Sequence, residues 1–531
     1  MSEAPKKQSF LHGTMLLAIS TAIVKIIGAF YSIPLKHIIG DDGFGYYSTA
    51  YEIYTLLLMI STAGLPVAMS RMISEASSLG HYRQVRKIYT VARTIFLTLG
   101  LIGALLMTVF CRQLAVFQEQ PDAWAAIGTL GPCCFLICLM STYRGFFQGQ
   151  SNMKPTSVSQ VIEAVTKLIV GLSAAFLLIS FTNVAAYPAA GAIFGVTMSC
   201  LISSFYLNHC FRKAYKDMPE SAEEVSSGGD IAKGLLAIAI PITIGSAGLQ
   251  ILTVLETKIY MGQLLQTMSQ QEADVQKGIY NFTQKIFNMP CAFITPITIS
   301  ASPAITAFLT KEEFDSAKAT EESAARVTAL ISAPCAVGLA VLAAPVTGLL
   351  GGYTGDKLAL ATSLMAVLGV CILFNAIVLL TNAIMQAHGH VNLPVINMFI
   401  GGIIKLVAVF ILTGNPKIGI LGTPIGSLLC YLCITILNLI TMAKVLPNAP
   451  RIIRNMLRAI GAALIMGVVV FGTYYAIETF WVPGSRIISC GLPLIVGVVV
   501  YAVSAILLKA ITKEDCLLLP KGEKIAKLLH L

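Results

Sequence analysis

Long apolar runs separated by short polar connections follow one another through the whole chain. A bilayer core about 30 Å thick is crossed by a helix of about 20 apolar residues, and each run has about this length or more. We predict fourteen spans, at residues 10–33, 44–70, 88–110, 123–147, 157–181, 185–207, 233–262, 279–308, 323–350, 358–386, 393–413, 418–443, 457–480 and 488–508. The pattern therefore predicts an all-α polytopic membrane protein with fourteen transmembrane helices.

Composition agrees with this class of protein. Of the 531 residues, 56% are hydrophobic and 12% are charged, whereas soluble domains carry about 25% charged residues. The connections leave no room for a large soluble domain. Lys6 and Lys7 precede the first apolar run, which lacks a small-residue cleavage site, so we expect an uncleaved helix and not a signal peptide.

The distribution of positive charge predicts the topology. With the N-terminus inside, the inner segments hold 24 Lys and Arg and the outer segments hold seven. The outer seven are Lys36, Arg112, Lys277, Lys285, Lys357, Lys417 and Arg486. Because Lys and Arg concentrate in cytoplasmic loops, we expect both termini to be cytoplasmic. The same rule accounts for the net charge of +10, so we expect no nucleic-acid partner.

The chain also divides into two similar halves. Residues 208–234 are polar and rich in Ser and Gly, which is typical of a linker. At an offset of 233 residues, Tyr47 aligns with Tyr280 and Glu52 with Lys285. Repeats of this kind place a binding site near the bilayer midplane, between the lobes. We expect an N-terminal lobe at 1–208, a linker at 209–232, a C-terminal lobe at 233–443, two added spans at 444–508 and a basic amphipathic tail at 509–531.

Charged residues inside the first two spans are candidates for function. A Lys or Asp at the centre of a membrane helix costs roughly 2.5 to 3.5 kcal/mol on insertion scales, so it is a functional hypothesis by default. Lys25 and Glu52 occupy such positions, on either side of a Gly/Asp turn that begins at Gly40. The alternative is an ion pair between them that only joins two helices.

Further charges lie in or near later spans. Lys285, near the outer end of its span, either contacts an anion or extends to the interface, and Lys405 faces a cavity or pairs with another helix. Glu163 and Lys167 are spaced i, i+4 with Glu first, which predicts a self-neutralising pair. Glu256 and Lys258 point to different faces; Glu256 is either a proton or cation coupling site or part of a solvated helix end.

The 13 cysteines mostly lie in apolar runs, where they pack as small residues. Cys430 and Cys433 form a C-x-x-C pair, but neither a His nor a second pair flanks it, so we predict no metal site. We likewise expect no disulfide framework, no cofactor and no catalytic residue.

Four segments carry a resemblance to a known superfamily. They are KIIGAFYSIPL from Lys25, GDDGFGYY from Gly40, AGLPVAMSRMISEA from Ala63 and RGFFQGQSNMKPT from Arg144. The chain resembles the multidrug/oligosaccharidyl-lipid/polysaccharide flippases, and within them the branch of stage V sporulation protein B and MurJ-like lipid II flippases. The resemblance implies two six-helix lobes in a V around a central cavity, and two C-terminal helices that form a groove for a polyprenyl tail.

The same resemblance implies a bacterial cell-membrane flippase that moves an undecaprenyl-pyrophosphate-linked cell-wall or envelope precursor to the outer leaflet by alternating access. Lys25 falls on a family cationic position, Lys285 matches more loosely, and Glu52 and the lack of an arginine cluster depart from the pattern. Substrate contact is expected from Lys25, Glu52, Lys285 and Lys405. Expected partners are the lipid-linked oligosaccharide, anionic membrane lipids and proteins of cell-wall synthesis. The alternatives are a multidrug or cation antiporter and a membrane-embedded glycosyltransferase or polymerase.

Overall fold

A computed structural model describes residues 10–510 apart from residues 63, 183, 220, 447 and 482–485. It leaves out some further side chains within helices, including those of residues 10–19 and Lys25. The described residues form helices and contain no β-strand. Eleven helical segments among them are long and apolar enough to cross a membrane. The predicted class, an all-α multi-pass membrane protein, is confirmed.

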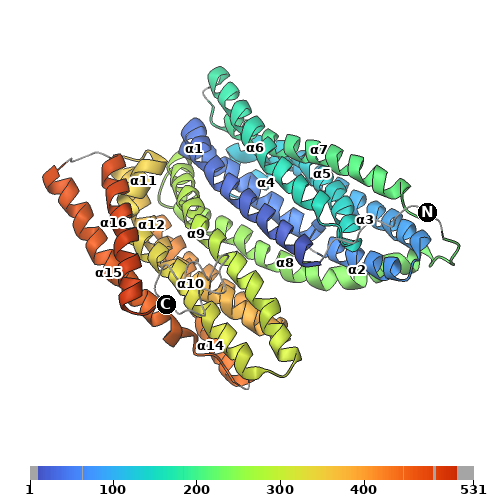
Figure 1. Cartoon of the computed structure of the whole chain (residues 1–531). Helices are drawn as coiled ribbons and strands as arrows, with labels where there is room; N and C mark the ends of the chain where they lie inside the picture. The colour runs from blue at the N-terminus through green and yellow to red at the C-terminus, as the bar shows by residue number, and fades with distance from the viewer. Residues whose placement is uncertain are drawn as a thin grey trace. The chain divides into compact units, whose positions relative to one another are not determined.

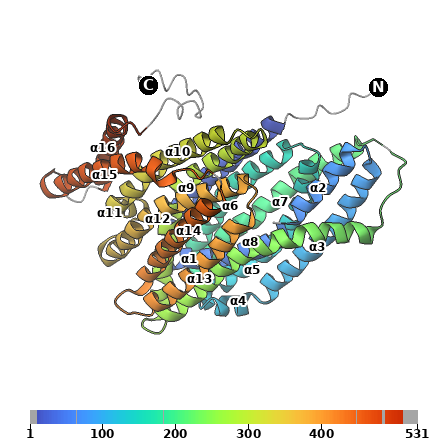
Figure 2. The same cartoon turned by 90° about the horizontal axis from the view of Figure 1, so that it is seen from below.

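The chain forms two compact units, Met1–Gly278 and Ile279–Leu531. Unit 1, drawn in blue to green in Figures 1 and 2, contains α1 to α8 and the first turns of α9. Its elements are α1 (Phe10–Thr62), α2 (Leu65–Ser78), α3 (Tyr82–Val109), α4 (Cys111–Phe117), η1 (Pro121–Ala123), α5 (Trp124–Gly149), α6 (Lys154–Phe181), α7 (Ala186–Lys216), α8 (Gly228–Leu264) and the start of α9 (Gln270–Thr310).

Unit 2 contains the rest of α9 and all later helices. They are α10 (Phe314–Val341), α11 (Ala343–Gly351), α12 (Gly355–Ala387), α13 (Asn392–Thr413), η2 (Gly419–Leu421), α14 (Gly422–Val445), α15 (Ile452–Ala476), η3 (Ile477–Trp481) and α16 (Arg486–Leu507). Each of the fourteen predicted spans corresponds to helix in the two units. Among the eleven apolar segments, α1 and α2 are counted as one, and α8 and α9 are not included.

The first two predicted spans meet at Gly40, inside α1. Gly40 has φ 75° and ψ −174°, which interrupts the helix between two helical parts. Glycine adopts positive φ without the penalty that a Cβ imposes, so the predicted turn is reduced to one residue. Lys36 and Asp41 form an ion pair of 3.4 Å across this break and are 8% exposed. The assignment of Lys36 to an outer loop is therefore wrong: it belongs to the helix and is buried.

Small residues set the spacing of helices within unit 1. A Cβ on Gly195 of α7 would lie 2.3 Å from the Cα of Gly171 in α6. Two glycines in contact let the helix backbones approach closely, which is the usual way that membrane helices gain packing energy. α6 and α7 therefore form a tight pair, and it presents the polar face of α6 toward α1 and α5.

The linker lies against the start of α3. It is shorter than predicted, because α7 continues to Lys216 and α8 begins at Gly228. The Arg83 N–H donates to Ser221 Oγ at 3.1 Å and the Gln84 N–H donates to Glu223 Oε1 at 3.0 Å. The first N–H groups of a helix have no partner inside the helix, so the linker supplies the cap that His81 at the N-cap position does not.

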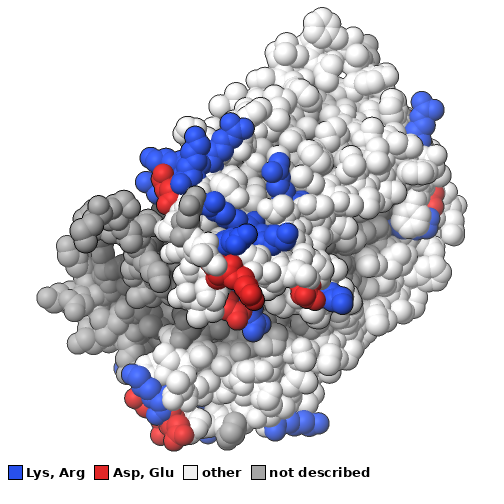
Figure 3. Space-filling view, turned by 90° about the vertical axis from the view of Figure 1, so that its right-hand side faces the viewer, with Lys and Arg blue, Asp and Glu red and all other residues white. Residues whose placement is uncertain are grey.

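Exposed basic residues gather at this end of unit 1. They include Arg83, Lys87, Lys213, Lys216 and Lys233, which lie where α3 begins, α7 ends and α8 begins. Figure 3 views the molecule from the side on which α2 and α3 lie in Figure 1, and it shows Lys and Arg with fewer acidic residues among them. This is the end that the charge distribution predicts to be cytoplasmic.

Unit 2 has an apolar outer surface on α15 and α16. Val468, Leu494 and Val498 are 74%, 55% and 65% exposed. In water such exposure would cost about 25 cal/mol for each Å², whereas lipid tails cover it without cost. On the inner side, a Cβ on Gly467 would lie 2.4 Å from Cγ1 of Val337, so α15 packs closely on α10.

Candidate functional site

A buried ion pair lies in unit 1 between α1 and the first turns of α9. Lys277 Nζ is 4.0 Å from Glu52 Oε2, and the two side chains are 0% and 18% exposed. Lys277 also donates to Thr49 Oγ1, and Thr257 Oγ1 donates to Glu52 Oε2 at 2.8 Å. The assignment of Lys277 to an outer loop is wrong, because α9 begins at Gln270 and carries this lysine into the interior. Glu52 is thus a partner of a buried lysine.

Asp274 forms the other half of this cluster and is 1% exposed. Its carboxylate accepts hydrogen bonds from Tyr46 Oη at 3.0 Å, Gln120 Nε2 at 2.8 Å and Gln270 Nε2 at 3.0 Å. Burial of a carboxylate requires hydrogen-bond donors of this kind. Asp274 is not among the predicted site residues, because residues 266–277 are polar and resemble a loop; the i, i+3 spacing of Asp274 and Lys277 is the signal that the sequence offers.

The backbone beside the cluster permits little change. A Cβ on Gly278 would lie 1.7 Å from the carbonyl oxygen of Asp41, and one on Gly45 would lie 3.1 Å from the carbonyl oxygen of Asp274. The start of α9 therefore packs directly on the second part of α1, immediately after the break at Gly40.

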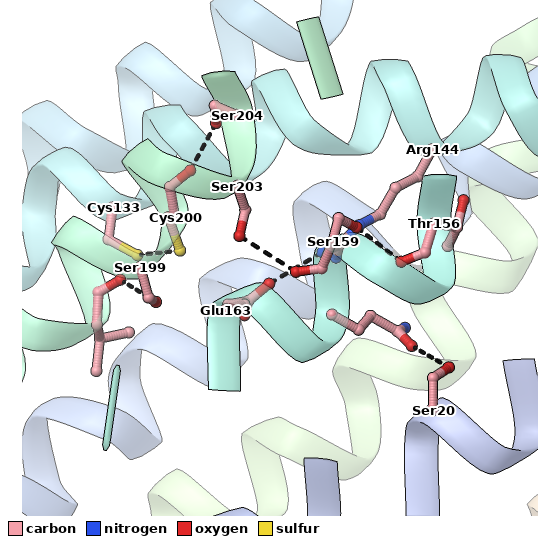
Figure 4. Close-up of polar contacts among 12 residues, drawn as sticks. Ser20, Cys133, Arg144, Thr156, Ser159, Glu163, Ser199, Cys200, Ser203 and Ser204 are labelled. Carbon is pink, nitrogen blue, oxygen red and sulfur yellow. Dashed lines mark hydrogen bonds and ion pairs between the residues drawn. The ribbon is translucent and has the colours of Figure 1, made fainter. Parts of the chain in front are cut away.

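A second polar cluster lies along α6. Arg144 of α5 donates to Glu163 Oε2 at 2.9 Å and to Ser159 Oγ at 3.1 Å, and Ser20 of α1 donates to Gln160 Oε1 at 3.3 Å. Figure 4 shows Arg144 reaching across to Ser159 and Glu163. Arg144 and Glu163 are 20% and 30% exposed. Together they form a half-buried, neutral pair between two helices.

This arrangement corrects the prediction for Glu163 and Lys167, which was a self-neutralising pair. Glu163 pairs instead with Arg144, because α5 brings a guanidinium with several donors to it. Lys167 instead faces aromatic rings of α1: Nζ is 4.6 Å from the ring centroid of Tyr51, 5.1 Å from that of Tyr31 and 5.9 Å from that of Tyr47. Spacing on one helix did not determine either partner.

Glu256 and Lys258 lie on different faces of α8, as their spacing predicts. Glu256 is 5% exposed. Lys258 forms an ion pair with Glu119 at 3.6 Å, where the side chains are 38% and 36% exposed, and its Nζ lies 4.3 Å from the ring centroid of Phe117. Lys258 is therefore part of an exposed pair at a helix end.

Lys25 lies in the first part of α1, but its side chain is outside the described residues. In unit 2, Lys285 on α9 and Lys405 on α13 are both half-buried. The predicted substrate contacts of these three lysines and of Glu52 stay predictions. The basic tail at residues 511–531 is also outside the described part of the chain.

Unit 2 has a buried amide network that joins α12, α13 and α14. Asn438 is 0% exposed; its amide donates to Thr381 Oγ1 and to Asn382 Oδ1, both at 2.8 Å, and accepts from Asn397 Nδ2 at 2.9 Å. Amide side chains of this kind hold membrane helices together. In the described part of the chain, no three His, Cys, Asp or Glu side chains are grouped to hold a metal.

Two family models match the chain. The model described as polysaccharide biosynthesis protein matches residues 10–309, and the MatE model matches residues 264–411. Among curated proteins, the chain is 26% identical to stage V sporulation protein B of Bacillus subtilis (strain 168), over 84% of this chain and 86% of that protein. It is 25% identical to the lipid II flippase MurJ of the same organism, over 75% and 76% of the two chains.

Solved structures show the same fold. The lipid II flippase MurJ in its inward closed conformation matches with a TM-score of 0.66 at 15% identity, covering 92% of this chain and 98% of that one. An inward-facing multidrug resistance MATE family transporter of the MOP superfamily matches with a TM-score of 0.63 at 15% identity, covering 79% and 97%. The first family model spans more than half of the sequence. The chain therefore belongs to the polysaccharide biosynthesis protein family.

Proposed function

We propose that this protein is a flippase that moves an undecaprenyl-pyrophosphate-linked oligosaccharide, such as a cell-wall precursor, from the inner to the outer leaflet by alternating access. The observation that carries the proposal is the difference in coverage between the two kinds of solved neighbour. The MurJ structure covers 92% of this chain, whereas the matching MATE structures cover 79% to 87% of it, although each match spans nearly all of the neighbour.

We assign the additional part of the chain to α15 and α16, the two spans that the sequence places after the repeat. Their exposed, apolar outer faces suit contact with a hydrocarbon chain, since a polyprenyl tail stays in lipid while its head group crosses. A substrate made of a long apolar tail and a charged head needs both an apolar surface for the tail and polar interior helices for the head. A small soluble drug does not need the apolar surface.

The polar residues inside the helices support binding of the charged head group. A pyrophosphate and a sugar must be separated from hydrocarbon while they cross the membrane, and lysine supplies a point charge for phosphate. We propose Lys25, Lys285 and Lys405 as phosphate contacts, and both termini as cytoplasmic. The two-lobe division at 1–208 and 233–443 and the polyprenyl groove at 444–508 belong to the same proposal.

Transport of a labelled lipid tests this function. In proteoliposomes, the wild-type protein is expected to move fluorescent lipid II between leaflets, and Lys25→Ala is expected to stop the movement. Lys258→Ala is the matched control, because Lys258 lies in an exposed pair with Glu119, and it is expected to transport normally. A wild-type protein that moved small cations and no lipid would overturn the proposal.

A multidrug or cation antiporter is the second candidate, and the match of the MatE model to residues 264–411 favours it. An antiporter requires a carboxylate whose charge changes during transport. Glu52 and Asp274 are carboxylates inside unit 1, but hydrogen bonds and Lys277 hold them. Ion-driven efflux that is lost in Asp274→Asn, with no lipid movement by the wild type, would favour this candidate.

A further inference from the structure

Lys167 occupies an unusual environment within unit 1. Its ammonium lies 4.6 to 5.9 Å from the ring centroids of Tyr51, Tyr31 and Tyr47. The three tyrosines come from both parts of α1, on either side of Gly40. They also contact one another: the ring centroid of Tyr47 is 6.3 Å from that of Tyr31 and 5.9 Å from that of Tyr51. We call Lys167 with these three tyrosines the tyrosine cage.

The cage is preorganised on one side and reachable on the other. Tyr31 and Tyr47 are 2% and 3% exposed, so packing fixes their rings. Tyr51 and Lys167 are half-buried. A lysine that is held by fixed rings and stays partly exposed loses little entropy on binding a ligand, because its geometry is set in advance.

The charge of the cage is not neutralised within the described part of the chain. Glu163, one turn away on α6, forms its ion pair with Arg144 at 2.9 Å, and the contacts of Lys167 are with the three tyrosines, through their rings and a side-chain hydrogen bond with Tyr47. A cation over a ring gains about 0.5 to 2 kcal/mol, which offsets only part of the cost of a charge in a membrane span. An anion bound on the exposed side of Lys167 would offset the remainder of this cost.

We propose that the tyrosine cage is a subsite for a phosphate group, in which Lys167 supplies the charge. The proposal rests on the proposed flippase function for the identity of the ligand, which is a polyprenyl-linked pyrophosphate. The ordinary membrane phospholipids carry the same phosphate chemistry, so the experiment must separate the two sources.

Binding to the full-length protein in nanodiscs provides the test. The probes are undecaprenyl pyrophosphate, uncharged undecaprenol and phosphatidylglycerol. Lys167→Met is expected to weaken undecaprenyl pyrophosphate binding by at least about tenfold, the size of one charged hydrogen bond, and to leave undecaprenol binding unchanged. Lys167→Arg keeps the charge and is expected to stay within about threefold of the wild type. Competition by phosphatidylglycerol at equal strength would overturn the assignment to the polyprenyl ligand.

Lys258→Met is the matched control, because Lys258 also lies over an aromatic ring, that of Phe117 at 4.3 Å, but outside the cage. It is expected to bind the pyrophosphate lipid as the wild type does. The melting temperature separates a binding role from a structural one: Lys167→Met removes an uncompensated charge and is expected to melt no lower than the wild type. A lower melting temperature with unchanged affinity would refute the proposal.

The outcome also distinguishes this subsite from the flippase function. If the wild type binds the pyrophosphate lipid through Lys167 but does not move it between leaflets, the proposed function fails and the subsite stands. If the wild type moves the lipid, and Lys167→Met binds and moves it equally well, the subsite fails and the function stands.

Discussion

Glu52 is expected to stabilise unit 1 chiefly by compensating Lys277. Lys277 is 0% exposed and its Nζ is 4.0 Å from Glu52 Oε2. At this distance and an effective dielectric constant of about 20, the attraction between unit charges is about 4 kcal/mol. Removal of one partner from a buried pair costs about 3 to 5 kcal/mol, because the other charge is left buried. Since Asp274 lies in the same cluster, we expect the lower end, about 3 kcal/mol, for Glu52→Gln.

Glu52→Gln and Lys277→Met should lower the stability of unit 1 by different amounts. Lys277→Met leaves two carboxylates that keep their hydrogen-bond donors. Glu52 is 18% exposed and still accepts from Thr257 at 2.8 Å, and Asp274, which is 1% exposed, still accepts from Tyr46, Gln120 and Gln270. A partly exposed carboxylate with a donor is less costly than a fully buried ammonium, so we expect Lys277→Met to cost about 1 to 2 kcal/mol. The double variant removes both charges and is expected to be more stable than Glu52→Gln alone.

Thermal unfolding in detergent or nanodiscs measures these differences. For a cooperative unit of a few hundred residues, 1 kcal/mol corresponds to roughly 2 °C, so Glu52→Gln should melt roughly 6 °C below the wild type. Glu119→Gln is the control: it makes the same substitution in the exposed pair with Lys258, where loss of the pair costs less than about 1 kcal/mol. If Glu52→Gln melts as the wild type and loses lipid transport, Glu52 contacts substrate and the compensating role is refuted.

Two further predictions concern packing and the linker. Gly278→Ala is expected to destabilise unit 1 by about 1 to 3 kcal/mol, because its Cβ would lie 1.7 Å from the carbonyl oxygen of Asp41. Gly262→Ala on α8 is the control and should leave the stability unchanged, since nothing lies within 4 Å of its Cβ. Equal melting temperatures of the two variants would contradict this prediction. Hydrogen bonds from Ser221 and the backbone of the linker and α3 lower the pKa of Glu223 from 4.5 to about 2. A lowered pKa stabilises the docked linker above pH 4.5, and this contribution is lost as the pH falls toward 2. The protection factor for hydrogen exchange at the α3 N-terminus, which corrects for the intrinsic pH dependence of exchange, should therefore fall in acid, and Glu223→Gln should abolish that fall; an unchanged acid dependence of the protection factor in the variant would refute the assignment.

The sequence predicted the membrane class and the positions of the spans, because apolar runs of bilayer length are a local property that needs no knowledge of the fold. Contacts between distant segments were not predictable in this way. The partner of Glu163 is on α5, the rings around Lys167 are on α1, and Lys277 is buried because α9 begins earlier than its apolar run. Each of these depends on which helices pack together.

The contacts in unit 1 also give its charged residues different expected roles. Glu52 with Lys277, Lys36 with Asp41 and Arg144 with Glu163 are ion pairs between or within helices, and they neutralise charge that would otherwise oppose insertion. A charge that is already paired has little left to give a substrate, because binding must first break the pair. Lys167, held by rings instead of a carboxylate, keeps its charge available. Position within a span therefore identifies charges that need an explanation, and the partner decides which of them is suited to bind an anion.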